Sequence, residues 1–201
     1  MISFYTYTCC FVYTYFRTSQ IIPQRPEHVF VSDITYIKSR ERTHYLSLVT
    51  DAYSRKIVGY KLSDDMSAEN VVKAFNMAVK KRNSKQTLIH HSGRGLQYCA
   101  SIYQDALKKN NVKPSMTDGY DCYQNALAER INGILKQGFL MYKCNNAKEL
   151  KQLIKESIET YNNKRPHLGL NMKTLPLYTT KNQKSQLLWP DLILLKTANL
   201  F

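Results

Sequence analysis

The sequence lacks the cysteine pattern of a metal site or a disulfide framework. Its five cysteines are scattered along the chain, at Cys9, Cys10, Cys99, Cys122 and Cys144. They have neither the C-x-x-C spacing nor the histidine partners that are typical of zinc sites. We therefore expect reduced thiols in a cytosolic protein.

A long hydrophobic run is also missing. Residues 1–16 are uncharged, but they are rich in Tyr and Thr and have no basic start. A membrane-spanning helix needs about 20 consecutive apolar residues, and a secretory signal begins with a positively charged segment. The sequence therefore predicts no membrane anchor, and we expect a cytoplasmic location.

Negative charge is scarce. The chain has 15 acidic residues against 29 Lys and Arg, which gives a formal net charge of +14. This balance favours a polyanionic partner, with nucleic acid ahead of a membrane surface. Charge alone does not establish such a partner, because many basic proteins are simply solvated by their lysines.

The order of the predicted elements indicates one α/β domain, which begins near Glu27 after an irregular lead-in over residues 1–26. Strands are predicted at 28–38, 43–50, 56–62, 87–91 and 112–115, and helices at 67–82, 101–109, 124–142 and 147–163. The first three strands form a meander. Later strands alternate with helices, which predicts a mixed sheet flanked by helices.

An aspartate stands in the middle of the first predicted strand. Asp33 lies within a β-prone run that extends from Val29 to Ile37. Aspartate is depleted in strands and is costly to bury alone, so Asp33 requires a metal, a cation or backbone donors. The alternative is a solvent-facing residue on an edge strand.

A short apolar run at residues 88–91 breaks into a polar turn that contains Gly93 and Gly95. This pattern indicates a buried strand that ends in a loop, which is where α/β proteins place their chemistry.

The helix predicted at 124–142 has two faces. Apolar side chains share one face, and four polar residues, Asn125, Glu129, Asn132 and Lys136, share the opposite face. The carboxylate of Glu129 therefore shares a polar face with Lys136. Many amphipathic helices simply solvate such a face, and the spacing alone leaves that alternative open.

These three segments resemble the acidic motifs of integrase-like (DDE) insertion-sequence transposases. The run Ser32-Asp33-Ile34-Thr35-Tyr36 resembles the first motif, His90 to Tyr98 the second, and Asn125-Ala126 with Ala128-Glu129 the third. In this family an aspartate normally stands at the position of Gly93. The 35 residues between Gly93 and Glu129 match the separation associated with the DDE arrangement.

The resemblance runs from about residue 28 to residue 174, and it implies a ribonuclease H-like fold with a two-ion Mg²⁺ (or Mn²⁺) site. Magnesium prefers carboxylate oxygen, and two such ions activate the attacking hydroxyl and stabilise the leaving oxygen in phosphodiester transfer. By this resemblance Asp33 bridges both ions, Glu129 holds one, and Gly93 supplies no ligand, so the site is incomplete. Imidazole is a poor magnesium ligand, so His90 and His91 are not expected to replace the acid. The residues expected to contact DNA are Lys136, Arg94, Asn125 and Asn132.

The chain also departs from the family in one helix and at its ends. Gly138 is predicted inside the 124–142 helix, where the family usually has a glutamate, and an interior glycine costs about 1 kcal/mol relative to alanine. We expect that residues 1–17, which resemble no segment of the family, leave no room for the helical DNA-binding region that family members carry upstream, and that residues 175–201 form a divergent tail. We expect a truncated, partly decayed transposase copy that acts at the nucleoid of a bacterial-type cell.

Three functions stay open as alternatives. The first is a transposase catalytic core that cleaves and joins DNA with Mg²⁺, supported by Asp33 and Glu129. The second is a non-catalytic remnant that binds DNA or forms homo-oligomers, supported by Gly93. The third is a ribonuclease H-like nuclease without strand transfer, which is disfavoured because the motifs resemble those of transposases.

Overall fold

A computed structural model describes residues 22–117, 125–140, 144–167 and 174–175. The predictions for residues 1–21, for most of the loop before the 124–142 helix and for nearly all of the tail after residue 174 lie outside the described residues. The boundaries proposed at residues 26 and 174 therefore stay predictions.

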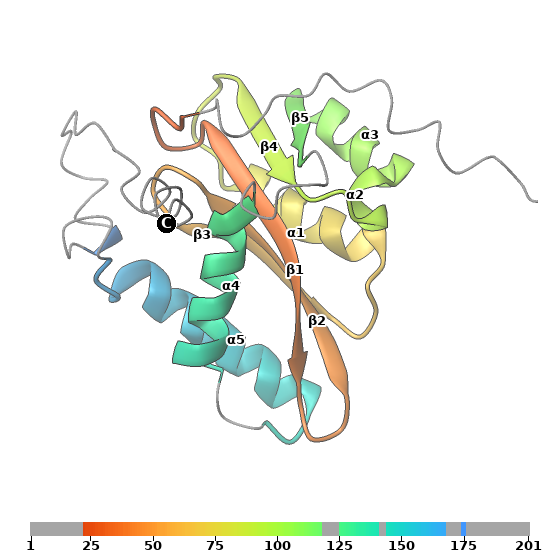
Figure 1. Cartoon of the computed structure of the whole chain (residues 1–201), viewed down its shortest axis with the longest axis vertical. Helices are drawn as coiled ribbons and strands as arrows, with labels where there is room; N and C mark the ends of the chain where they lie inside the picture. Colours follow the sequence, from red (N-terminus) through yellow and green to blue (C-terminus); the bar gives the residue numbers. More distant parts are fainter. Residues whose placement is uncertain (1–21, 118–124, 141–143, 168–173, 176–201) are drawn as a thin grey trace, which may run out of the picture.

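The core is a five-stranded mixed sheet in the order β3-β2-β1-β4-β5 (Figure 1). The strands are β1 (Val29–Lys38), β2 (Thr43–Asp51), β3 (Ile57–Ser63), β4 (Leu88–Ser92) and β5 (Val112–Met116). The first three pair antiparallel as a meander, whereas β4 pairs parallel to β1 and β5 parallel to β4. The predicted mixed α/β sheet is confirmed.

Helices cover both faces of this sheet (Figure 1). They are α1 (Ala68–Lys80), α2 (Leu96–Cys99), α3 (Ser101–Lys109), α4 (Ala126–Gly138) and α5 (Ala147–Asn163). One apolar cluster joins the sheet to α1 and α3, and another joins it to α4 and α5. Among the helices in the described ranges, none has the length and apolar content to cross a membrane.

Strand β1 contributes side chains to both clusters, because successive side chains of a strand point to opposite faces. Phe30 packs in the α1 and α3 cluster together with Phe75. Ile37 packs in the α4 and α5 cluster together with Ile131. The first four residues of β1 are all buried, so this half of the strand is covered on both faces.

The structure corrects the prediction for α4 at its C-terminal end. Gly138 is the last residue of this helix, not an interior residue. The N–H groups of Phe139 and Leu140 both donate to the Leu135 carbonyl, at 3.1 and 2.9 Å. The helical hydrogen-bond pattern ends at this shared acceptor. Gly138 therefore does not carry the cost in stability that is expected of a glycine inside a helix. The sequence analysis also missed α2, a four-residue helix after Gly95.

Gly59 sets the approach of α1 to β3. A Cβ atom at this position would lie 2.2 Å from the Ala74 carbonyl oxygen and 3.0 Å from the Ala78 Cβ. We expect Gly59→Ala to lower the free energy of unfolding by about 1–3 kcal/mol or more, because backbone atoms must separate. Urea unfolding measures this change.

Gly133 provides the matched control, because a Cβ atom there has no neighbour within 4 Å. This glycine lies inside α4, so Gly133→Ala is expected to stabilise the protein by about 0.5–1 kcal/mol. A Gly59→Ala protein as stable as the wild type would contradict the close packing of α1 on β3.

Candidate active site

The parallel pairing of β1 and β4 places two of the three acidic positions side by side. Ser32 pairs with Ser92 in the last rung of this ladder. Asp33 directly follows Ser32 in β1, and Gly93 directly follows Ser92 at the end of β4. Strand β4 ends at Ser92, whose carbonyl accepts the Thr117 N–H at 3.1 Å. Position 93 therefore lies beside Asp33 where the sheet opens.

Helix α4 brings the third acidic position to the same place. Glu129 and Asn132 are three residues apart on this helix, so their side chains share a face. The Asn132 Nδ2 atom donates to the Asp33 Oδ2 atom at 2.8 Å. Glu129 is exposed, and its charge acts on Asp33 to raise the Asp33 pKa. The three positions that the sequence analysis selected thus converge.

Two asparagines of α4 are buried, so the alternative of a merely solvated polar face does not apply to them. Asn125 is 7% exposed and Asn132 is 5% exposed. The Asn125 Nδ2 atom donates to the Ser32 carbonyl at 3.2 Å. This part of α4 therefore packs on β1, and the two amides hold the backbone and the carboxylate around Asp33. Sequence periodicity separated polar from apolar residues, but it could not show that a polar face was buried.

The environment of Asp33 disfavours its ionised form. Burial is the largest cause and raises the Asp33 pKa, and Glu129 raises it further. Hydrogen bonds from the Ile34 N–H and Asn132, together with the Lys136 charge, oppose the shift but do not cancel it. A carboxylate in this state gains from a nearby cation, as expected for a metal-binding or catalytic acid.

Gly93 leaves an open position at this site. A Cβ atom at residue 93 would have no neighbour within 4 Å, and the backbone is not in the left-handed region. Among the described residues, no three His, Cys, Asp or Glu side chains form a group that could hold a metal ion. Two converging carboxylates suit one magnesium-sized cation, whereas a pair of ions needs more oxygen ligands.

The two histidines before Gly93 belong to the core. His90 Nε2 shares hydrogen bonds with Ser32 Oγ at 2.7 Å and with the Tyr103 hydroxyl at 3.0 Å. Burial, with a smaller effect of His91, lowers the pKa of His90 to about 3. His91 Nδ1 shares a hydrogen bond with Ser115 Oγ at 3.0 Å. His90 is therefore neutral at physiological pH, and both rings have partners in the core.

The two basic residues predicted to contact DNA differ in their surroundings. Lys136 is near enough to Asp33 for its charge to lower the Asp33 pKa. The Lys136 Nζ atom is also 4.3 Å from the centre of the Tyr36 ring. Arg94 is exposed, and its Nε donates to the Thr117 carbonyl at 2.6 Å. Lys136 thus borders the acids, whereas Arg94 ties together the segments that follow β4 and β5.

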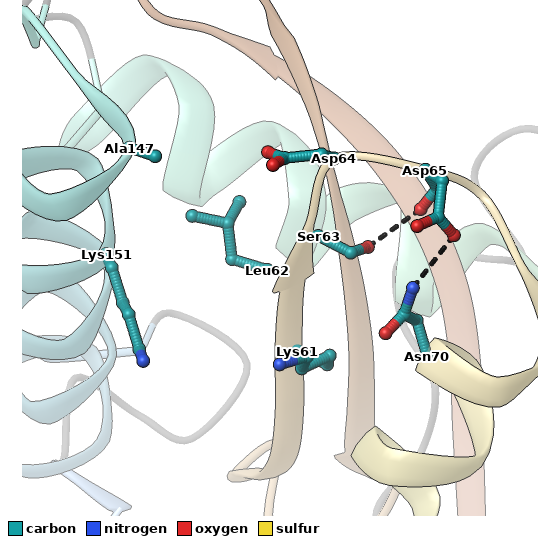
Figure 2. A pocket seen from close by; sticks show the side chains of 8 residues that line it. All are labelled: Lys61, Leu62, Ser63, Asp64, Asp65, Asn70, Ala147 and Lys151. Atoms are coloured by element: carbon teal, nitrogen blue, oxygen red, sulfur yellow. Dashed lines mark hydrogen bonds between the residues drawn. The ribbon is translucent and has the colours of Figure 1, made fainter.

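A cavity of about 330 Å³ lies elsewhere, between the end of β3 and the N-terminal turns of α1 and α5. Figure 2 shows Asp64 and Asp65 on one side and Lys151 of α5 on the other. The Asp65 Oδ1 atom accepts from the Ser67 N–H and from Asn70. Asp64 pairs with Arg42 and His44. These carboxylates stabilise the turn after β3, and the cavity includes none of the three acidic positions.

A mixed sheet in this order, with helices on both faces and carboxylates on β1 and α4, defines an α/β core of the ribonuclease H-like class. Two family models, each described as an integrase core domain, match residues 23–122 and 110–174. The chain therefore belongs to the integrase core family, as an integrase-like insertion-sequence transposase core.

Curated relatives support this family. A 31 kDa protein of insertion element IS600 from Shigella sonnei is 39% identical over 150 residues, which cover 74% of this chain and 55% of that protein. The transposase for IS904 from Lactococcus lactis is 37% identical over 151 residues, 74% of this chain and 60% of that protein. The chain thus spans somewhat more than half the length of these two relatives.

Solved structures show the same fold. The magnesium complex of the HTLV-2 integrase catalytic core domain, in its dimeric form, has a TM-score of 0.64 and 20% identity and covers 79% of this chain and 99% of that one. A chain of the simian T-cell lymphotropic virus intasome, in complex with PP2A regulatory subunit B56 gamma, has a TM-score of 0.69 and 19% identity, covering 80% of this chain and 56% of that one. At these identities the likeness concerns the fold alone.

The raised pKa of Asp33 has a consequence for stability. The folded protein binds this proton more tightly than the unfolded chain, whose carboxyl has the ordinary pKa of 3.8. The stability cost of ionising Asp33 is therefore absent below pH 3.8 and increases as the pH rises through the folded pKa. We expect Asp33→Asn to raise the Tm at pH 7 in EDTA, and this gain to shrink as the pH falls toward 3.8.

Asp105→Asn is the control for this measurement, because the Asp105 side chain is 72% exposed. Its Tm should follow that of the wild type over the same pH range. An Asp33→Asn protein that is no more stable than the wild type at pH 7 would show that the fold accepts the ionised carboxylate without cost.

Proposed function

We propose that this chain is the catalytic-core part of a transposase that acts on DNA ends by divalent-cation-dependent cleavage and strand transfer, with activity impaired by Gly93. The observation that carries the proposal is that Asp33 lies beside residue 93 in the β1–β4 register and is near enough to Glu129 of α4 for the Glu129 charge to raise the Asp33 pKa. The sheet and both helix layers around this point are those of the integrase core family. Nucleoid association in a bacterial-type cell follows from DNA binding.

The roles of the chain's own residues follow from their contacts. Asp33 is oriented by Asn132 and is partly buried, so it presents a carboxylate that a cation stabilises. Glu129, exposed on α4, supplies the second carboxylate. Asn125 holds the Ser32 carbonyl and so positions the backbone next to Asp33. A Mg²⁺ or Mn²⁺ ion held by this pair would supply Lewis-acid activation of the reacting oxygens.

The residues present account for a weakened metal site. Asp33 and Glu129 offer two carboxylates, and Gly93 offers no side chain. Two dications facing two carboxylates would be poorly neutralised, so the ion that depends on position 93 should bind weakly. This observation also favours a second function, a non-catalytic core that binds DNA or forms homo-oligomers.

Gly93→Asp is the direct test of the impaired metal site. The backbone conformation and the free space at Gly93 accept a side chain without strain. We expect this change to raise cleavage or joining of insertion-sequence end DNA by orders of magnitude, because it restores a third carboxylate. It should also enlarge the rise in Tm that Mn²⁺ produces, since the ion binds the folded state.

Gly93→Asn is the matched control, because it has the same size without the charge. It should remain as inactive as the wild type. A wild-type protein that cleaves DNA as fast as Gly93→Asp, and loses this activity in Asp33→Ala, would contradict the impairment. A Gly93→Asp protein that neither binds Mn²⁺ nor cleaves DNA would instead favour the non-catalytic function.

Lys136 is the basic residue best placed to contact a phosphate near the acids. It lies on the Glu129 side of α4 and close enough to lower the Asp33 pKa. We expect Lys136→Ala to weaken binding to all duplexes alike, and to reduce the slope of log K against log salt by about 0.9 for one lost phosphate contact. Fluorescence anisotropy at several salt concentrations measures both. A loss confined to one DNA sequence would argue against a phosphate contact.

A further inference from the structure

Two turns lie at the end of the sheet opposite to the acid site. Residues 81–87 join α1 to β4, and residues 110–111 join α3 to β5. Because β4 and β5 are parallel and Leu88 pairs with Val112, both turns enter the sheet at the same end, near the top of Figure 1. Gly93 follows the other end of β4. Residues that are far apart in the sequence therefore share one surface at this end.

Exposed lysines gather on these turns and on the ends of the elements beside them. We call this the distal basic surface and define it by its exposed lysines, which are Lys80, Lys81, Lys85, Lys108, Lys109 and Lys113. Arg25, in the segment before β1, adds a further cation, because its guanidinium donates to the Thr87 carbonyl at 3.2 Å.

Few acids offset the charge of the distal basic surface. Glu27 accepts two backbone N–H groups of the turn between α1 and β4, at 3.0 and 2.6 Å, so its carboxylate is directed at the backbone. Asp51 is buried. Asp105 lies 4.0 Å from Lys108. The lysines of this surface outnumber these acids, so this end of the domain is strongly positive.

Helix ends explain only part of this charge. Lys80, Lys108 and Lys109 lie in the last turns of α1 and α3, where the negative end of the helix dipole favours a cation. Lys85 and Lys113 lie outside these helices, so the dipole does not account for them. The surface thus has more positive charge than the helix ends require, as is typical of a surface that meets a polyanion.

The distal basic surface is too far from the acid site to act on DNA held there. The five residues of β4, which separate the two places, span about 17 Å. Interactions between exposed charges are largely screened beyond about 8 Å at physiological salt. A phosphate on this surface therefore belongs to a different segment of DNA, or to a different duplex, from a phosphate at Asp33 and Glu129.

Duplex DNA suits this surface better than a membrane does. Lysines bind phosphate oxygens without sequence preference, and a duplex presents about one phosphate per 1.7 Å of its axis. Within residues 80–87 and 108–113, all of which the structure describes, no large apolar side chain is exposed. Segments that lie in a membrane surface normally provide such side chains. The surface therefore has the charge that binds a nucleic acid but lacks the apolar groups that a membrane favours.

We propose that the distal basic surface binds the phosphate backbone of duplex DNA, at a second contact that is separate from the acid site and indifferent to sequence. The core then holds two segments of DNA, one at each end of β4. This inference goes beyond the proposed catalytic role, because it depends on DNA as the ligand of the chain but not on cleavage.

The first test uses the full chain and a duplex of arbitrary sequence, with binding measured by fluorescence anisotropy at several salt concentrations. The distal variant, Lys80→Gln/Lys81→Gln/Lys85→Gln, removes three charges from the surface. We expect its affinity at low salt to fall by about tenfold or more. The slope of log K against log salt should decrease by about 2–3, because each lost phosphate contact contributes about 0.9.

The second test locates the contact in the unaltered chain. Lysines are acetylated with and without the duplex, and the modified positions are identified by mass spectrometry. We expect the duplex to protect Lys80, Lys85 and Lys113. The same protection should be seen in Lys136→Ala, because the distal contact does not depend on the acid site.

Helix α5 provides the matched control, because acids are interspersed among its exposed lysines. The lysines are Lys148, Lys151 and Lys155, and the acids are Glu149, Glu156 and Glu159. Substitution of these three lysines by Gln removes the same charge from the chain as the distal variant does. This α5 variant should keep the affinity and the salt slope of the wild type, and the duplex should not protect the three lysines from acetylation.

A distal variant that binds the duplex as tightly as the α5 variant would overturn the distal contact. Unchanged duplex binding, together with lost binding to phosphatidylserine vesicles, would overturn it in favour of a membrane surface. If the distal variant loses duplex binding while Gly93→Asp never cleaves DNA, the distal contact holds and the proposed catalytic role fails. A folded wild-type protein that binds no duplex at low salt would overturn both.

Discussion

The site depends on the parallel hydrogen-bond ladder between β1 and β4. This ladder sets the register of Ser32 against Ser92, and so it determines which residue of each strand comes next at the point where β4 ends. Asp33 and position 93 become neighbours although 59 residues separate them along the chain. A slip of one residue would turn the Asp33 side chain to the opposite face, away from α4. The register is protected because β1 is buried between two apolar clusters.

Hydrogen bonds hold the residues around Asp33 in place, and the same surroundings make the ionised form of Asp33 unfavourable. Buried hydrogen bonds below the site join His90 to Ser32 and Tyr103, and burial keeps this imidazole neutral. On the α4 side, Asn132 holds the carboxylate while Glu129 disfavours its charge. A fold that retains such a cost is typical of a site built to bind a cation, because the bound cation offsets it.

Gly93 adds no functional group to the site, and the framework around it does not depend on a side chain at this position. The position is at a loop where a side chain would contact nothing within 4 Å, so neither packing nor backbone strain depends on which residue stands there. Gly59 is the contrast, because the approach of α1 to β3 leaves no space for even one added carbon. A side chain at position 93 would therefore change the chemistry of the site and leave the packing of the sheet unchanged.

The sequence by itself determined the element order and the mixed α/β class, because alternating and helical apolar periods depend on local geometry. Motif resemblance selected Asp33, Gly93 and Glu129, and the structure brings these positions together. Periodicity could not reveal that Asn125 and Asn132 are buried against β1, since a polar face can meet water or another polar surface. Nor could it show where α4 ends, because the two N–H groups that share the Leu135 carbonyl lie beyond Gly138. Only the tertiary structure decided that β4 stops at Ser92 while β1 continues to Lys38, because strand length depends on the partners that each strand finds.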